Sequence, residues 1–163
     1  MTEHTFPLAP FYKGWDGYQQ QLVRALAPLS AEQLTLHTAP HLRSVGIIAT
    51  HIIGARARWL HYVLREDDEK LVSLGTWDHS DQPARSGSEL ASGLEATWQV
   101  IQNALQRWTI ADLEEIFHDI DDNGEEETFT RQWVIWHLIE HDVHHGGEIS
   151  FALGMHGLAA IDL

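Results

Sequence analysis

Apolar residues recur at spacings of three and four along four stretches of the chain, a periodicity typical of amphipathic helices. The pattern predicts helices over residues 11–29, 44–65, 88–108 and 131–154. The apolar stripes of the first three are Tyr18, Leu22, Ala25, Leu26 and Leu29; Val45, Ile48, Ile52, Ala55 and Trp59; and Leu90, Leu94, Trp98, Ile101 and Leu105. Four such helices and no convincing strand predict an all-α fold, a four-helix bundle, built as a single domain over residues 1–163.

The ends of the helices and their connections add detail to this prediction. Ser44 and Thr130 suit the N-caps of the second and last helices, and Gly154 suits the end of the last. Residues 66–87 are too many for a tight turn, so the second and third helices are free to run parallel or to lie apart. This long connection could also act as a lid.

A second connection is strongly acidic. From Ala111 to Glu127 the chain carries nine acids and no base. The string IFHDI within it suits a short extended piece, and Asp122-Asn123-Gly124 is a turn signal. We interpret the segment as a solvated connection, with a second cation site as the alternative.

Composition excludes several classes of function. The formal charge of −14 repels nucleic-acid phosphates and acidic lipid head groups. Cysteine is absent, which excludes disulfides, thiolate zinc sites and a protein thiol nucleophile. The N-terminal sequence MTEHTFPLAP lacks the features of a signal peptide, and no stretch has the roughly 18 apolar residues of a membrane span. We therefore expect a cytoplasmic protein.

Histidines are concentrated in the last predicted helix. His137, His141, His144 and His145 lie within nine residues and fall in an arc of roughly 100° on one helical face, together with Glu148. Imidazole is a poor helix former and poor core material, so a bound divalent cation is the physical reason for such a cluster. The i, i+4 pair His141 and His145 can offer two nitrogens to one ion. We interpret His137 and His144 as packing or hydrogen-bonding residues, with ligation as the alternative.

The third ligand must come from elsewhere in the chain. His51 lies at the edge of the apolar stripe of the second helix, whereas His61 stands among charged residues about 80° further round the helix. The remaining histidines, His4, His37, His41, His79, His118 and His156, lie in predicted connections or tails. The pattern therefore favours His51 together with His141 and His145. Trp133 and Trp136 of the last helix are expected in the core.

These motifs resemble those of the DinB/YfiT-like superfamily of bundle metalloproteins. The resemblance covers nearly the whole chain and is carried by LSAEQL, by SVGIIATHI and above all by HLIEHDVHHGGEI, which is close to the family pattern H-x-x-x-H-x-x-x-H-x-G-[QE]-I. In that family one histidine of the second helix and two of the last hold a divalent metal. Position by position, these are His51, His141 and His145. Gly146 stands where a basic residue is common, which would change the charge near the site.

Three neutral imidazoles leave a divalent ion coordinatively open, the composition of a catalytic site. The resemblance implies a thiol S-transferase that uses bacillithiol, mycothiol, glutathione or a similar small thiol, and the absence of cysteine fits a sulfur brought by a co-substrate. The carboxylates of such a thiol would need a cationic side chain in the pocket, for which Arg43, Arg56 and Arg58 are candidates. The alternatives are a hydrolase of amides or esters, with Glu148 or Asp142 as base, and a metal-binding stress-response protein without catalysis. Asp142 replaces the glutamate of H-E-x-x-H, which argues against a zincin protease.

The ligand chemistry and the resemblance also predict the metal and the partners. Imidazole ligands suit zinc or nickel, with iron, manganese or copper as alternatives. We expect one divalent ion, a small-molecule substrate, and no nucleic acid or membrane partner. The resemblance also implies a homodimer formed through bundle faces.

Overall fold

The computed structural model describes residues 6–162, and these residues are mostly helical. In chain order the elements are a 3-10 turn Ala9–Tyr12, α1 (Lys13–Leu26), a 3-10 turn Gln33–Thr35, α2 (Val45–Arg58) continued by a π-helical turn Trp59–Val63, α3 (Glu69–Leu74), α4 (Gly87–Arg107), a 3-10 turn Ile110–Glu114, β1 (Ile116–Ile120), β2 (Glu126–Thr130) and α5 (Arg131–Met155). Residue His4, expected in a tail, lies outside the described part.

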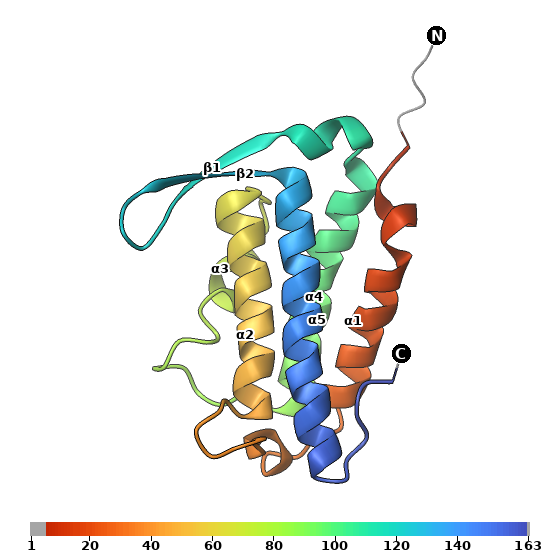
Figure 1. The fold of residues 1–163 in the computed structure, drawn as a ribbon, viewed down its shortest axis with the longest axis vertical. Coiled ribbons are helices and arrows are strands. Elements are labelled where there is room, and N and C mark those ends of the chain that lie inside the picture. Colours follow the sequence, from red (N-terminus) through yellow and green to blue (C-terminus); the bar gives the residue numbers. More distant parts are fainter. Residues whose placement is uncertain (1–5, 163) are drawn as a thin grey trace.

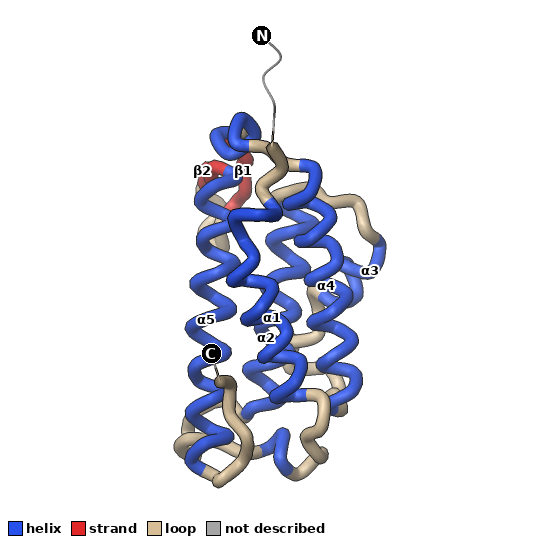
Figure 2. The backbone as a smooth tube through the Cα atoms, turned by 90° about the vertical axis from the view of Figure 1, so that its right-hand side faces the viewer, coloured by secondary structure: helices blue, strands red, loops and turns tan. Residues whose placement is uncertain are grey.

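The long helices α1, α2, α4 and α5 lie side by side along the length of the molecule (Figure 1). α2 packs against both α5 and α4, and α4 packs against α1. α1 and α5 run in one direction while α2 and α4 run in the other, so the long connection from 66 to 87 joins two adjacent parallel helices (Figure 1). The view turned by 90° shows the small hairpin at one end of the helices and α3 at their side (Figure 2).

The predicted apolar stripes form the core. All five named positions of α4 are buried, as are Val45, Ile48, Ile52 and Ala55 of α2. Ser44 caps α2 by accepting from the Ile47 N–H, and Thr130 caps α5 by accepting from the Trp133 N–H. Both predicted N-caps are therefore confirmed, because an N-cap oxygen satisfies amides that have no partner within the helix.

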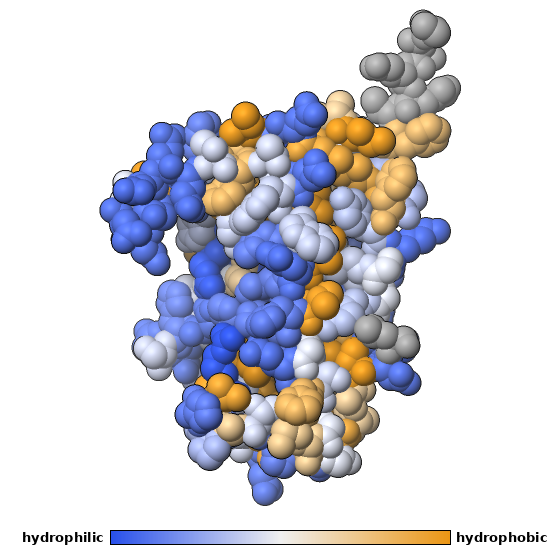
Figure 3. All heavy atoms as spheres, in the orientation of Figure 1, coloured by the Kyte–Doolittle hydropathy of each residue, from blue (hydrophilic) through white to orange (hydrophobic). Residues whose placement is uncertain are grey.

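The prediction of no convincing strand was wrong, whereas the short extended piece predicted at IFHDI is confirmed as β1. β1 and β2 pair as an antiparallel hairpin with Phe117 opposite Phe129. The predicted turn joins them, with Gly124 at φ +82°, and Asp121 accepts backbone N–H groups of Asn123 and Glu125. Only Phe117 of the ten strand residues is fully buried, so exposed acids conceal the alternating pattern. Figure 3 shows this corner of the molecule as a mostly hydrophilic projection.

Other boundaries also differ from the prediction. The connection after α2 contains α3, which is too short to show helical periodicity and begins at an Asp68 cap. α5 continues past Gly154 to Met155. The glycine that follows this helix with a positive φ is Gly157, at +70°. Trp133 and Trp136 were expected in the core, but they are 41% and 59% exposed, so this prediction was wrong.

Candidate metal centre

The packing of α2 against α5 brings His51, His141 and His145 together. One ring nitrogen from each side chain lies within 4.8 Å of the others. The Nε2 atoms of His51 and His141 are 3.2 Å apart. The centroid of the His145 ring lies 4.9 Å from that of His51 and 4.4 Å from that of His141. The structure thus places the three histidines expected from the sequence in one cluster.

His51 is oriented by a carboxylate from the long connection. Its Nδ1 lies 2.9 Å from Oδ2 of Asp78, so Nδ1–H donates and Nε2 carries the lone pair. Arg58 holds Asp78 with two hydrogen bonds of 2.7 and 2.9 Å, and donates a third to the carbonyl of Gly75 at 2.6 Å. Burial opposes ionisation of Asp78, but the hydrogen bonds from Arg58 and His51 outweigh it and lower its pKa to about 2.

His145 is oriented in the same way by its own helix. Its Nδ1 lies 2.6 Å from Oε2 of Glu148, one turn further along α5. Arg43 reaches the same place, with a nitrogen 3.4 Å from Nδ1 of His145 and 3.6 Å from Glu148. Because Nδ1–H donates to the carboxylate, the Nε2 of His145 is left with its lone pair. Burial lowers the pKa of His145, although Glu148 partly opposes this shift.

The pKa of His141 is strongly lowered. Burial, followed by the neighbouring rings of His145, His51 and His137, lowers its pKa to about 3. It is therefore neutral at physiological pH. Among residues 6–162 its Nδ1 is buried without a hydrogen-bond partner.

These observations fit a divalent cation. The Nε2 atoms of His51 and His141 lie 3.2 Å apart, within hydrogen-bond distance, so a proton on one of them is shared with the other, and a cation bound by both nitrogens would replace that proton. Within the described chain, no fourth side chain of a ligating type joins this group of three. His51, His141 and His145 would hold the ion and leave part of its coordination open.

The other histidines do not join the cluster. His137 stacks on Trp133, with ring centroids 5.0 Å apart, and its Nδ1 lies 3.0 Å from Glu140. His144 is exposed and belongs with His145 and Glu148 to a second, overlapping group of potential ligands. His61 contacts Tyr62 on the far part of the second helix. The acids of the hairpin form no such group within residues 6–162.

The candidate arginines and carboxylates have different surroundings. Arg56 and Asp142 are completely buried and pair with each other at 2.7 Å. Arg58 is engaged by Asp78 and Gly75. Arg43 has a 41% exposed side chain and only the two long contacts already described, so it is the arginine best placed to meet a solute.

Sequence reasoning missed Asp78 and the role of Gly146. Asp78 lies in a connection without periodicity, so no pattern pointed to it. Gly146 was expected to change the charge near the site; instead it is buried against α1, where a Cβ would lie 2.1 Å from the Tyr18 hydroxyl oxygen. Packing, and not the charge of the metal site, explains glycine at this position.

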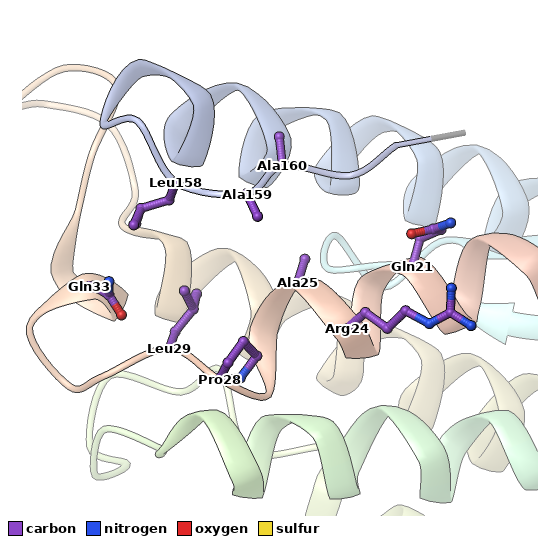
Figure 4. Close-up of a pocket in the computed structure, with 9 residues that line it drawn as sticks. All are labelled: Gln21, Arg24, Ala25, Pro28, Leu29, Gln33, Leu158, Ala159 and Ala160. Carbon is purple, nitrogen blue, oxygen red and sulfur yellow. The ribbon is translucent and has the colours of Figure 1, made fainter.

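A surface pocket lies elsewhere, between the end of α1 and the C-terminal segment (Figure 4). Its volume is about 270 Å³, and Arg24 is its one charged lining side chain. None of the three clustered histidines lines it. In the described part of the chain, no helix is both long enough and apolar enough to cross a membrane.

Fold and site together define a mostly helical protein with a three-histidine cluster of metal-binding type. The chain belongs to the DinB family, whose model matches residues 1–162. It is similar in structure to a DinB-like protein from Bacillus cereus, with a TM-score of 0.72 and 24% identity over 96% of this chain and 97% of the other. A conserved protein from Enterococcus faecalis matches with a TM-score of 0.56 and 17% identity over 86% and 91% of the two chains. No curated protein matches.

Proposed function

We propose that this chain binds one divalent metal ion through His51, His141 and His145 and uses it to transfer a small thiol to an electrophile. The observation that carries the proposal is the convergence of the three imidazoles, with ligating atoms within 4.8 Å of one another. We interpret α1, α2, α4 and α5 as the four-helix bundle that presents them.

The donor set supports a catalytic site over a structural one. Structural zinc sites are closed by four protein ligands, whereas catalytic sites keep a position for water or substrate. A bound divalent ion lowers the pKa of a thiol or water that reaches it. Asp78 and Glu148 orient two of the ligands, so the chain's own residues fix the geometry before substrate arrives.

Two features support a thiol as the substrate. The chain has no cysteine, so the sulfur must come from a co-substrate. Arg43 lies beside His145 and Glu148 with a side chain that is 41% exposed, and its guanidinium group suits a carboxylate of a thiol such as glutathione, bacillithiol or mycothiol. Zinc or nickel suits the imidazole ligands; iron, manganese and copper are the alternatives.

Hydrolysis has less support from the surroundings of the metal centre. Asp142 is fully buried and paired with Arg56, so it cannot act as a base toward a substrate. Glu148 is engaged by His145 at 2.6 Å. A metal-binding stress-response protein without catalysis is the remaining alternative, and metal binding alone does not distinguish it from a transferase.

The test begins with metal and continues with thiol. We would measure Co²⁺ and Zn²⁺ affinity of untagged wild type, His51→Ala, His141→Ala and His145→Ala, with His118→Ala, an exposed hairpin histidine, as control. We expect about one equivalent in wild type and the control, and loss of high-affinity binding in the three variants. Glutathione should then change the visible spectrum of the Co²⁺ protein, and Arg43→Ala should weaken this response. An unchanged affinity in His51→Ala would contradict the site, and an unchanged spectrum with each thiol tested would contradict the transferase.

We further propose that a second copy of this chain covers the outer face of α5. Val143, Phe151 and Met155 are 49%, 65% and 57% exposed there, next to Gly147 and Gly154, whose lack of side chains permits close helix approach. Phe151→Glu should convert a dimer to a monomer in analytical ultracentrifugation. A monomeric wild type at micromolar concentration would contradict this part of the proposal.

A further inference from the structure

In the described part of the chain, Asp78 joins the long connection, residues 66–87, to the histidine cluster through its hydrogen bond with His51. It lies 27 residues beyond His51, and its side chain is only 11% exposed. Its carboxylate uses both oxygens, Oδ1 for Arg58 and Oδ2 for Arg58 and His51. This is a carboxylate held in one orientation, because a bidentate arginine fixes both its position and its plane.

The surface of α2 is shaped to receive this carboxylate. His51, Gly54 and Arg58 are spaced i, i+3 and i+7 and therefore share one face of the helix. A Cβ at Gly54 would lie 2.7 Å from Oδ1 of Asp78 and 3.0 Å from Nη1 of Arg58. Since real Cβ atoms essentially never approach so closely, any larger residue at Gly54 would push the carboxylate away from the helix.

The position of Gly54 is costly on other grounds. It is buried in the middle of a helix, where glycine is less favourable than alanine. Gly17 of α1 shows the contrast, because nothing lies within 4 Å of its ideal Cβ. Space for the Asp78 carboxylate is therefore a specific reason for glycine at position 54.

We propose that Asp78 is a positioning residue of the metal centre, and that Gly54 and Arg58 form the seat that holds it against His51. The proposal rests on metal binding by the three histidines. Asp78 is not one of the three residues that would hold the ion; it accepts from Nδ1–H of His51 and so keeps Nε2 directed at the cluster. The connection 75–86 thereby becomes part of the metal centre, which sequence periodicity did not suggest.

The first experiment compares Asp78→Asn and Asp78→Ala with wild type. We would measure Co²⁺ affinity by competition with a chromophoric chelator, and record the visible spectrum at saturation. Loss of such a partner weakens metal binding roughly 10–100-fold. We expect Asp78→Ala to fall in this range with an altered spectrum, and Asp78→Asn, which retains an accepting oxygen, to fall between it and wild type. Urea unfolding of the metal-free proteins separates a loss of stability from a loss of ligand orientation.

The second experiment is a double-mutant cycle. Gly54→Ala should weaken Co²⁺ binding like Asp78→Ala, because the new methyl group displaces the carboxylate. In the Asp78→Ala background the same methyl group meets the space that the carboxylate has left, so adding Gly54→Ala should cost little further affinity. Gly17→Ala is the matched control, a helical glycine with open space, and should bind as wild type.

The outcomes separate this proposal from the metal centre itself. If His51→Ala abolishes binding while Asp78→Ala keeps both the affinity and the spectrum of wild type, the metal centre stands and the role of Asp78 is overturned. Additive losses in the cycle would overturn the seat formed by Gly54. If His51→Ala binds as wild type, the metal centre fails first.

Discussion

Gly146 and Gly147 are neighbours in α5 but face different surroundings. A Cβ at Gly146 would meet the hydroxyl oxygen of Tyr18 at 2.1 Å, whereas nothing lies within 4 Å of an ideal Cβ at Gly147. Both substitutions improve helix propensity, but only the first overpacks a buried contact. We expect Gly146→Ala to lower the free energy of unfolding by about 1–3 kcal/mol and Gly147→Ala to raise it by at most about 1 kcal/mol. Equal stability of the two in urea would contradict this.

Glu148 offers a second test at the same scale. It accepts from His145 at 2.6 Å, three residues away, and Glu140 contacts His137 in the same i, i+3 arrangement at 3.0 Å. Because His145 belongs to the cluster and His137 does not, Glu148→Ala should weaken Zn²⁺ binding roughly 10-fold or more, and Glu140→Ala should leave it unchanged. Competition with a chromophoric chelator measures both. Equal effects would show that these carboxylates act only through general charge.

The sequence was sufficient to predict that His51, His141 and His145 come together, but not to predict which residues contact them. His141 and His145 share a face by spacing alone, and the apolar stripe of α2 placed His51 beside the core. Asp142 directly follows a proposed ligand, yet it points about 100° away round the helix, into the interior. Asp78 was out of reach because contacts between a connection and a helix leave no periodic signal.

At the scale of elements, capping determines where the long helices begin. Ser86 starts α4 with a capping box, in which its hydroxyl accepts from the Glu89 N–H and the Glu89 carboxylate accepts from the Ser86 N–H. Ser86→Ala should destabilise the protein by about 1 kcal/mol in urea unfolding. Gln99→Ala, in the exposed middle of the same helix, is a control that should have little effect. Equal stability of wild type and Ser86→Ala would mean that the cap contributes nothing.

The same box predicts a pH dependence. Hydrogen bonds from the Ser86 N–H and hydroxyl lower the pKa of Glu89 below its ordinary 4.5. The unfolded chain therefore binds this proton at a higher pH than the folded protein does. The advantage of wild type over Glu89→Gln should be fully present above about pH 4.5, and should be lost as pH falls through the lower, folded pKa. Urea unfolding of both proteins between about pH 3 and pH 7 measures this difference in the free energy of unfolding. A difference that grows as the pH falls would contradict the prediction.

Elements stabilised by tertiary contacts were predicted only in part: the extended piece IFHDI and the turn Asp122-Asn123-Gly124 were expected, whereas strand β2 and helix α3 were not. The hairpin has one buried strand residue, Phe117, and Arg131 lies over its ring at 5.0 Å. α3 is held by Leu71 and Leu74 against the rest of the core. The long helices were predictable because each repeats its apolar face over many turns, whereas these short elements have too few residues for a periodicity to emerge.

At the scale of the whole molecule, a buried polar network joins all four long helices. Arg56 of α2 pairs with Asp142 of α5 and donates to Gln19 of α1 and Thr97 of α4, at 2.7 and 3.4 Å. Trp15 of α1 donates to Asp142 at 2.7 Å. Arg56 lies five residues after His51 and Asp142 directly follows His141, so the network links the two helices that carry the cluster. Apart from the amide nitrogen of Gln19, which is buried without a hydrogen-bond partner, these groups meet partners at defined positions, so the network favours one register of the helices.

The ion pair of Arg56 and Asp142 leads to a prediction about single and double substitutions. Removing one partner of a buried ion pair strands the other charge, at a cost of roughly 3–5 kcal/mol, whereas replacing both by apolar residues is far less costly. We therefore expect Asp142→Ala and Arg56→Met each to destabilise the protein by several kcal/mol, and Arg56→Met/Asp142→Leu to be more stable than either. The pair of Arg107 and Glu66, whose side chains are 58% and 14% exposed, is the control, where Arg107→Ala should cost less than either substitution in the fully buried pair. Urea unfolding of the metal-free proteins gives the coupling energy. If the two losses simply add in the double variant, then Arg56 and Asp142 do not depend on each other, and the register of α2 and α5 must be fixed by apolar packing alone.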